Sequence, residues 1–154
     1  HDLGKARTDL EDLPSHYKHA RDGVEPLNSL CDRLGLPNKW RQAGKLAITE
    51  HMRLKHWREM GSGKLVRLYQ KANNNPLGIK GLAIVGKADN QGSLMDEPED
   101  IQYDEFIKLG KRMFDEVSVD DFEGREGPER GEYLMQKRAK WVKKERNKIL
   151  KGDK

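Results

Sequence analysis

The chain is 154 residues long, and 34% of its residues are hydrophobic while 36% are charged. This length fits one domain, or one domain with a tail, and the high charge leaves room for only a small apolar core. We therefore expect a component of an assembly rather than a free-standing catalyst. No apolar stretch approaches the roughly 20 residues that a membrane-spanning helix needs, and no membrane partner is expected.

The charge is distributed in blocks of opposite sign. Residues 39–88 hold 11 Lys and Arg against 2 Asp and Glu, and residues 129–154 hold 10 against 4. Residues 89–128 hold 4 basic and 13 acidic side chains. Two basic surfaces separated by an acidic one are typical of proteins that bind polyanions, of which nucleic acid is the commonest. The acidic block would either shield the basic surfaces or dock a partner.

The single cysteine, Cys31, excludes an internal disulfide. Because the sequence also shows no secretory signal, we expect an intracellular, reducing compartment such as the cytoplasm, the nucleus or an organelle matrix. The chain begins with His1 rather than Met, so we interpret it as a processed product or a fragment. No function is assigned to that first residue.

Apolar spacing predicts a mainly helical fold of four to five helices, ending in a long basic helix. In chain order we expect a polar N-terminal arm over residues 1–13, a helical domain over 14–117, an acidic linker over 118–128 and the basic helix over 129–154. Within the domain, apolar side chains recur at helical spacing over residues 26–34, 39–60, 64–72 and 98–117. Residues 82–85 differ, because they form a short apolar run between glycines that predicts one strand or an extended loop.

Residues 27–48 invite comparison with a helix-turn-helix. Cys31 and Gly35 stand four apart, as the small residue and the turn glycine do in that motif. The recognition helix, however, should carry an aliphatic residue at the position of Arg41. Two packed helices joined by a proline turn are the alternative.

The strongest amphipathic pattern lies in residues 103–117. Its apolar side chains form one seam, made of Tyr103, Phe106, Ile107, Gly110, Met113, Phe114 and Val117. We expect this seam to be buried, either against the 39–60 helix or against another subunit. The second case gives a candidate protein interface of Tyr103, Phe106, Ile107, Met113 and Phe114.

Cationic side chains on two segments form the candidate nucleic-acid surface. The first set lies in residues 39–88 and comprises Arg41, Lys45, Lys55, Arg58, Lys64, Arg67 and Lys71. The second set falls within one sector of the C-terminal helix and comprises Arg130, Lys137, Lys140, Lys144, Lys148 and Lys151. Such a stripe can follow a phosphate backbone, with Tyr133 or Trp141 beside it to stack on bases. The alternative is a lysine-rich helix face that only solvates the helix.

The sequence offers no catalytic signature and no metal site. His16 and His19 are three residues apart, with Asp12 four residues before His16, but a zinc site needs three or four ligands at defined spacing. His51 and His56 are five residues apart and would not converge on one helix. We therefore expect structural or exposed histidines, no metal and no cofactor.

These features together predict a non-enzymatic, nucleic-acid-binding subunit or accessory protein of a larger assembly. That assembly would be a ribonucleoprotein or a viral DNA-packaging or replication machine, with protein partners or further copies of the chain. The choice between DNA and RNA stays open. The alternative is a structural adaptor that binds proteins through the 103–117 face and its acidic flanks. The salt dependence of binding distinguishes the nucleic-acid binder from the adaptor, because affinity based on phosphate contacts falls steeply with salt concentration and affinity based on apolar burial does not.

Overall fold

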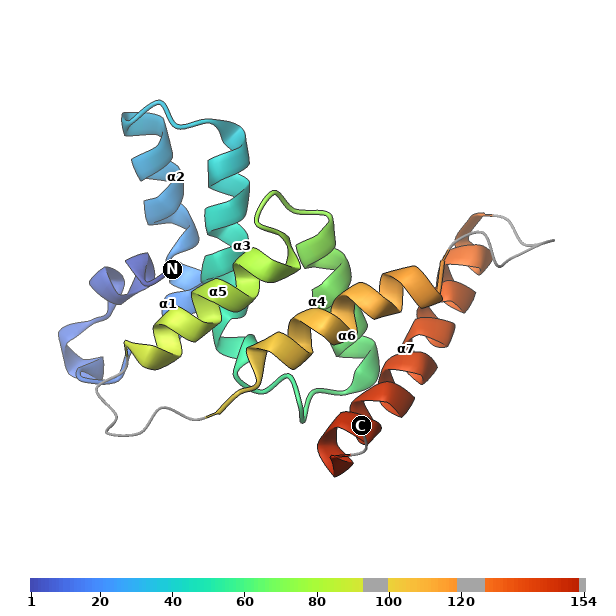
Figure 1. The fold of residues 1–154 in the computed structure, drawn as a ribbon. Helices are drawn as coiled ribbons and strands as arrows, with labels where there is room; N and C mark the ends of the chain where they lie inside the picture. Colours follow the sequence, from blue (N-terminus) through green and yellow to red (C-terminus); the bar gives the residue numbers. More distant parts are fainter. Residues whose placement is uncertain (93–99, 119–126, 153–154) are drawn as a thin grey trace.

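Figure 1 shows the fold in a computed structural model, which describes residues 1–92, 100–118 and 127–152. The described residues form helices and no strand. In chain order the elements are η1 (Leu3–Arg7), η2 (Leu10–Asp12), α1 (His19–Asp22), α2 (Val24–Arg33), α3 (Asn38–Leu54), α4 (Ser62–Asn73), α5 (Gly78–Gln91), α6 (Tyr103–Glu116) and α7 (Gly127–Lys151). The mainly helical class is confirmed, but the number of helices exceeds the four to five predicted. Within the described residues, no helix has both the length and the apolar composition to span a bilayer.

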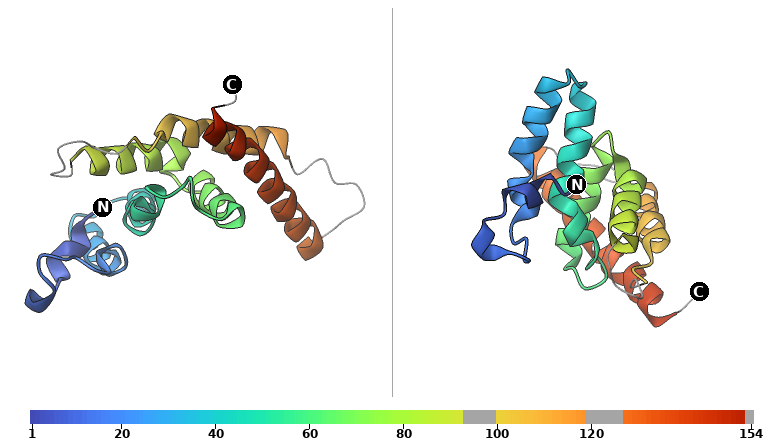
Figure 2. Two further views of the ribbon diagram at one scale, coloured as in Figure 1. Left: turned by 90° about the horizontal axis from the view of Figure 1, so that it is seen from below. Right: turned by 90° about the vertical axis from the view of Figure 1, so that its left-hand side faces the viewer.

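The main core lies among helices α3 to α7. Helices α5 and α6 follow each other along one side of α3 and α4, and α7 packs against α4 and α6 (Figure 2). Three fully buried aromatic side chains occupy the centre, with the Phe106 ring 5.9 Å from Trp57 and 4.7 Å from Tyr69 between centroids. Trp57 Nε1–H and the Tyr69 hydroxyl each donate to a backbone carbonyl. The core therefore holds its aromatic polar atoms without an unmet hydrogen bond.

Residues 82–85, predicted as a strand or an extended loop, lie inside helix α5, and that prediction is wrong. The helical period shows only in a wider window, because the buried residues Ile79, Leu82, Ala83 and Gly86 stand at i, i+3, i+4 and i+7. Gly86 allows α5 to approach α3 closely, since a Cβ there would lie 2.6 Å from Leu54 Cδ2. The glycines that suggested a strand therefore serve helix packing.

The 103–117 seam is buried, as predicted, but the protein's own helices cover it. Tyr103, Phe106 and Met113 are buried, and the partly buried Ile107 and Phe114 pack against the same cluster. The covering elements are chiefly α5 and α7, together with Trp57. Because residues 82–85 were predicted as a strand or an extended loop, helix α5 was not available to cover the seam, and another subunit remained a possible cover. These five side chains are therefore occupied inside the protein rather than presented to a partner.

Helices α2 and α3 lie side by side as a hairpin joined by residues 34–37 (Figure 1). Helix-turn-helix pairs instead cross at roughly 90–120°, so the structure supports two packed helices. Cys31 is buried between them with Leu27 and Ile48, as a packed thiol should be. Leu34, at the hairpin tip, is 60% exposed.

The two ends of the chain pack against the helical body. Residues 1–13, expected as a polar arm, contain η1 and η2, and η1 lies against α1 and α2. Most of the predicted acidic linker, residues 119–126, lies outside the described residues. The basic C-terminal helix is α7, which buries Leu134 and Val142 on one side.

Candidate metal centre

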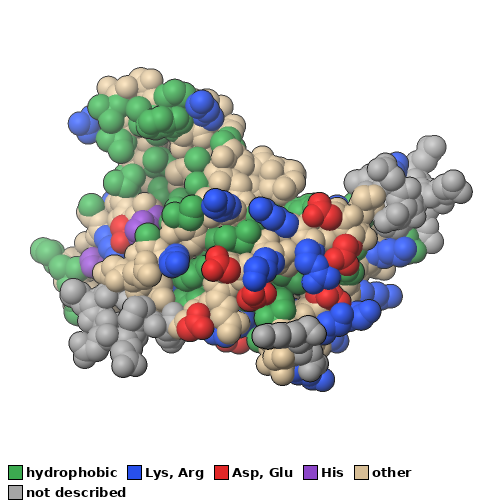
Figure 3. Space-filling view, in the orientation of Figure 1, with side chains coloured by type: hydrophobic (Ala, Val, Ile, Leu, Met, Phe, Trp, Pro, Cys, Tyr) green, Lys and Arg blue, Asp and Glu red, His purple; other side chains and the backbone are tan. Residues whose placement is uncertain are grey.

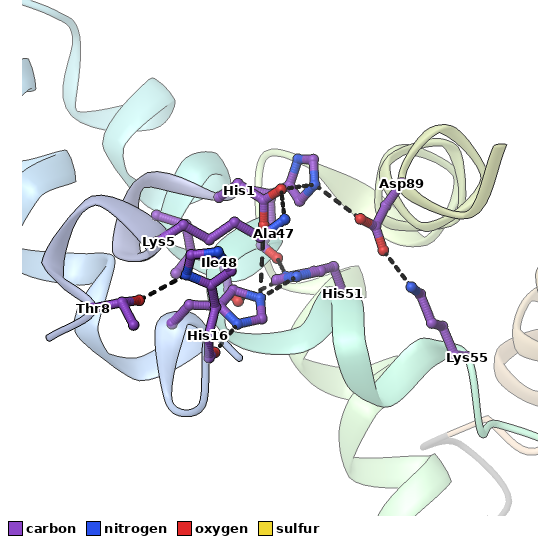
Figure 4. Close-up of polar contacts among 11 residues, drawn as sticks. His1, Lys5, Thr8, His16, Ala47, Ile48, His51, Lys55 and Asp89 are labelled. Atoms are coloured by element: carbon purple, nitrogen blue, oxygen red, sulfur yellow. Dashed lines mark hydrogen bonds and ion pairs between the residues drawn. The ribbon is translucent and has the colours of Figure 1, made fainter. Parts of the chain in front are cut away.

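Histidine and aspartate side chains from four separate segments meet beside α3. Figure 4 shows His1 of the N-terminal segment together with His51 of α3 and Asp89 of α5. Asp2 of the N-terminal segment and His19 of α1 join them. Ligand atoms of His1, Asp2 and His51 all lie within 4.8 Å of one another. We call these five residues the His–Asp cluster.

His19 and His51 face each other through the same ring atom, with their Nε2 atoms 3.3 Å apart. The other nitrogen of each ring is already engaged. His51 Nδ1 lies 2.9 Å from the carbonyl oxygens of Ala47 and Ile48, and His19 Nδ1 lies 2.7 Å from that of His16. Because a carbonyl oxygen only accepts, each Nδ1 carries a hydrogen, and the Nε2 atoms of the two rings are left to face each other. Metal-ligating histidines are held in this way, with the distal N–H on a carbonyl.

Burial keeps His51 in its neutral form. The side chain has no exposed surface, and desolvation lowers its pKa below the ordinary value. The desolvation outweighs the effects of the two backbone hydrogen bonds and of the negative charge of Asp89, both of which act to raise the pKa of His51. At neutral pH His51 therefore offers an unprotonated nitrogen, the form that binds metal ions.

The two carboxylates place negative charge around the facing imidazoles. Asp2 Oδ1 lies 3.6 Å from His19 Nε2, and this oxygen is buried without a hydrogen bond from any described residue. Asp89 Oδ1 lies 3.2 Å from His1 Nε2, a contact that joins α5 to the first residue of the chain. A buried carboxylate oxygen that accepts no hydrogen bond is unfavourable, and a bound cation would satisfy it.

Gly4 allows the N-terminal segment to reach the cluster. It is buried against α1, and a Cβ at this position would lie 1.9 Å from the His19 carbonyl oxygen. Only glycine therefore permits this approach, which brings Asp2 next to His19. Further out, Thr8 Oγ1 and His16 Nδ1 lie 2.8 Å apart and tie the segment to the stretch before α1.

A cavity of about 360 Å³ opens over the cluster between the N-terminal segment, α3 and α5. Two lysines line it: Lys5 Nζ lies 2.6 Å from Asp2 Oδ2, and Lys55 Nζ lies 2.8 Å from Asp89 Oδ2. Both ammonium groups are thus held at the cavity by the carboxylates of the cluster. Mixed imidazole and carboxylate ligands suit first-row transition ions such as Zn²⁺, Fe²⁺ or Mn²⁺.

This convergence could not be foreseen from the spacing of neighbouring residues. The histidines that are close in sequence, His16 and His19, were considered with Asp12, which is exposed in η2 and lies outside the cluster. His56 stays apart from His51, as predicted, and pairs with Glu59. A short signal did exist in the adjacent His1 and Asp2, but the partners of these two residues lie far along the chain.

The candidate nucleic-acid residues of α7 lie together on an exposed side of that helix. Lys137, Lys140, Lys144, Lys148 and Lys151 are all exposed, and Arg130 is half-buried. Lys148 also pairs with the buried Glu145 at 2.8 Å. The stripe therefore exists as a surface, and its contact with nucleic acid stays a proposal.

The cations of the first set are more dispersed. Lys45, Lys64 and Arg67 are exposed. The remaining four have partners inside the protein: Arg41 pairs with Asp32, Lys55 with Asp89, Lys71 with the buried Glu50, and Arg58 donates to the Asp100 carbonyl. Lys55 thus lines the cavity over the His–Asp cluster, a placement that the sequence did not suggest.

Comparison with known proteins adds a second line of information. The chain is similar to Multifunctional CCA proteins. It is 34% identical over 142 residues to that of Xanthomonas euvesicatoria pv. vesicatoria, covering 90% of this chain and 35% of the relative. It is 33% identical over 151 residues to the protein of Xanthomonas axonopodis pv. citri, which covers 96% of this chain and 37% of that relative. It is 30% identical over 141 residues to the protein of Acinetobacter baumannii, which covers 90% of this chain and 34% of that relative. The chain thus spans about a third of the length of these curated relatives.

No family model matches the chain, and no solved structure matches it. The relatives nevertheless overturn part of the sequence interpretation. Similarity to enzymes over most of the chain contradicts the prediction of a non-enzymatic assembly subunit, and the ribonucleoprotein and viral assignments with it. That prediction rested on the absence of a catalytic signature in this chain, which corresponds to only about a third of each relative.

Proposed function

We propose that the chain is part of a CCA-type enzyme that acts on tRNA, and that its His–Asp cluster binds a divalent metal ion and hydrolyses phosphate esters. The similarity to Multifunctional CCA proteins supports an RNA substrate. The hydrolytic assignment rests on the cluster itself, because the known relatives are about three times as long as this chain.

One observation carries the metal assignment. The Nε2 atoms of His19 and His51 lie 3.3 Å apart, and Asp2 Oδ1, which accepts no hydrogen bond from a described residue, lies 3.6 Å from His19 Nε2. Two imidazole nitrogens and a carboxylate oxygen thus lie close to one another. A divalent ion turns the same atoms into a ligand set.

The surroundings favour a phosphate ester as substrate. A transition ion held by His19, His51 and Asp2 would lower the pKa of a bound water and so supply the hydroxide that hydrolyses the ester, one water being consumed for each bond broken. Lys5 and Lys55 would neutralise the phosphate charge, and Lys55 would exchange its contact with Asp89 for one with the substrate.

The exposed lysines of α7 are the proposed second contact with RNA. A helix rises about 1.5 Å per residue, so Lys137 and Lys148 lie roughly 16 Å apart along the axis and span several phosphates. An intracellular, reducing location accords with the buried thiol of Cys31. Protein partners and a homo-oligomer also stay proposals, and they would need a surface other than the buried 103–117 seam.

Hydrolysis of bis(p-nitrophenyl) phosphate by the 154-residue chain tests the proposal. The chelated protein should be inactive, and addition of Mn²⁺, Zn²⁺ or Fe²⁺ should restore turnover. Asp2→Asn and His51→Gln should each reduce turnover at least about 100-fold, since both alter proposed ligands. His56→Ala is the matched control, because His56 is exposed and away from the cluster. Turnover that survives chelation, or that both ligand variants retain, would contradict the assignment.

A further inference from the structure

An exposed tryptophan stands in the first turn of α3. Trp40 is 59% exposed, whereas most large apolar side chains of α3 are buried. A cavity of about 510 Å³ lies beside its ring, lined also by Lys39, Ala43, Pro76 and Leu77. Figure 3 shows apolar side chains gathered over the α2–α3 hairpin, with histidines near its base. The indole thus borders an open space between α3 and the start of α5.

The charges around this cavity are of one sign. Residues 34–49 and 60–88 contain no Asp or Glu, so the cavity walls and α5 up to Ala88 carry only cations. On α5, Lys80 and Lys87 are exposed on either side of Ile84, which is 56% exposed. An apolar protein partner does not require such an imbalance, whereas a polyanion with flat apolar bases does.

We propose that Trp40 is a stacking platform for a base of single-stranded RNA, whose backbone then follows α5 toward the His–Asp cluster. Indole rings stack on any base, so the site would recognise an unpaired strand rather than a sequence. Lys39 and Lys80 would meet its phosphates. This inference rests on the proposed function for its RNA substrate, but it does not require that the metal be bound.

The position of Trp40 on α3 fits a strand of defined length. Trp40 and His51 are eleven residues apart, close to three full turns, so they lie on the same side of the helix and about 16 Å apart along it. Phosphates of a stacked strand recur about every 3.4 Å, so up to about five nucleotides would bridge the two sites. The cavity at Trp40 reaches Leu77 and that of the cluster reaches Ala88, so α5 runs from one to the other.

Fluorescence polarisation with labelled eight-nucleotide poly(A), in the presence of a chelator, tests the platform. Trp40→Ala should weaken binding about tenfold, and Trp40→Phe should recover most of the loss, because phenylalanine also stacks. A duplex of equal length should be bound equally by all three proteins, since its bases are not available. Leu34→Ala is the matched control, because Leu34 is exposed on the same hairpin but does not line the cavity.

Equal affinity of wild type and Trp40→Ala for the single strand would overturn the inference. So would an equal loss in Leu34→Ala, which would indicate a general apolar surface for a protein partner. Because chelator is present throughout, a failed metal site leaves this result unchanged. Conversely, the wild-type chain could show no metal-dependent hydrolysis while Trp40→Ala still weakens binding of the single strand as expected. That result would refute only the proposed hydrolytic function.

Discussion

Replacement of Phe106 by Ala tests whether the seam of α6 is the core of the protein. The ring has no exposed surface and lies against Trp57 and Tyr69 at centroid distances of 5.9 and 4.7 Å. Loss of a fully buried phenylalanine costs about 3–5 kcal/mol through lost transfer energy and the cavity left behind. The value should lie in the upper half of this range, because two aromatic contacts are lost as well. At about 2–4 °C per kcal/mol, the melting temperature should fall by about 8–20 °C.

Urea unfolding followed by far-ultraviolet circular dichroism measures this cost, with chelator present so that metal binding does not contribute. Tyr17→Ala is the control, because Tyr17 is an aromatic residue that is 74% exposed, and it should change the free energy of unfolding by less than about 0.5 kcal/mol. A loss below about 1 kcal/mol for Phe106→Ala would show that the seam is not a packed core. The adaptor hypothesis would then regain its surface.

Three further predictions follow from the cluster and the charged surfaces. Because burial lowers the pKa of His51, the unfolded chain binds a proton more readily than the folded one, so stability without metal should fall as pH drops below about 6.5. Between pH 5 and 7.5, the free energy of unfolding should depend less steeply on pH in His51→Gln than in the wild type. Equal slopes in the two proteins would show that His51 does not have a lowered pKa. Gly4→Ala should weaken Zn²⁺ binding at least about tenfold in titration calorimetry by displacing Asp2, whereas Gly63→Ala, where a Cβ meets open space, should not. The third prediction concerns a variant in which four lysines of α7 are replaced by alanine, namely Lys137, Lys140, Lys144 and Lys148. If each lysine neutralises one phosphate, the slope of log affinity for RNA against log salt concentration should become shallower by about three units. An unchanged slope would mean that the stripe only solvates the helix.

Local periodicity was sufficient to predict most helices, because burial of one side leaves a repeat that can be counted. Tyr103, Phe106 and Met113 define α6 in this way, and Leu65, Leu68 and Tyr69 define α4. Helix α5 was missed because glycines replace larger apolar residues where it approaches α3, so its buried side includes Gly86. The short apolar run at residues 82–85 therefore favoured a strand or loop over the helical spacing that is visible only in a longer window.

The candidate metal centre could not be predicted from spacing, because its members are distant along the chain. His1 meets Asp89 across 88 positions, and His19 meets His51 across 32. The approach depends on packing of the N-terminal segment against α1, which the polar composition of residues 1–13 did not suggest. Lys55 was assigned to a nucleic-acid surface for its charge alone, yet its ammonium group contacts Asp89 inside the cavity.

X-ray absorption spectroscopy of the chain with one equivalent of Zn²⁺ tests the central claim most directly. If the His–Asp cluster is the metal site, the spectrum should show nitrogen and oxygen ligands near 2.0–2.1 Å, with the outer-shell scattering of at least two imidazoles. His51→Gln should remove one imidazole from this pattern, and His56→Ala should leave it unchanged. A spectrum of oxygen ligands alone, or one that His51→Gln does not alter, would contradict the metal site and the hydrolytic function built on it.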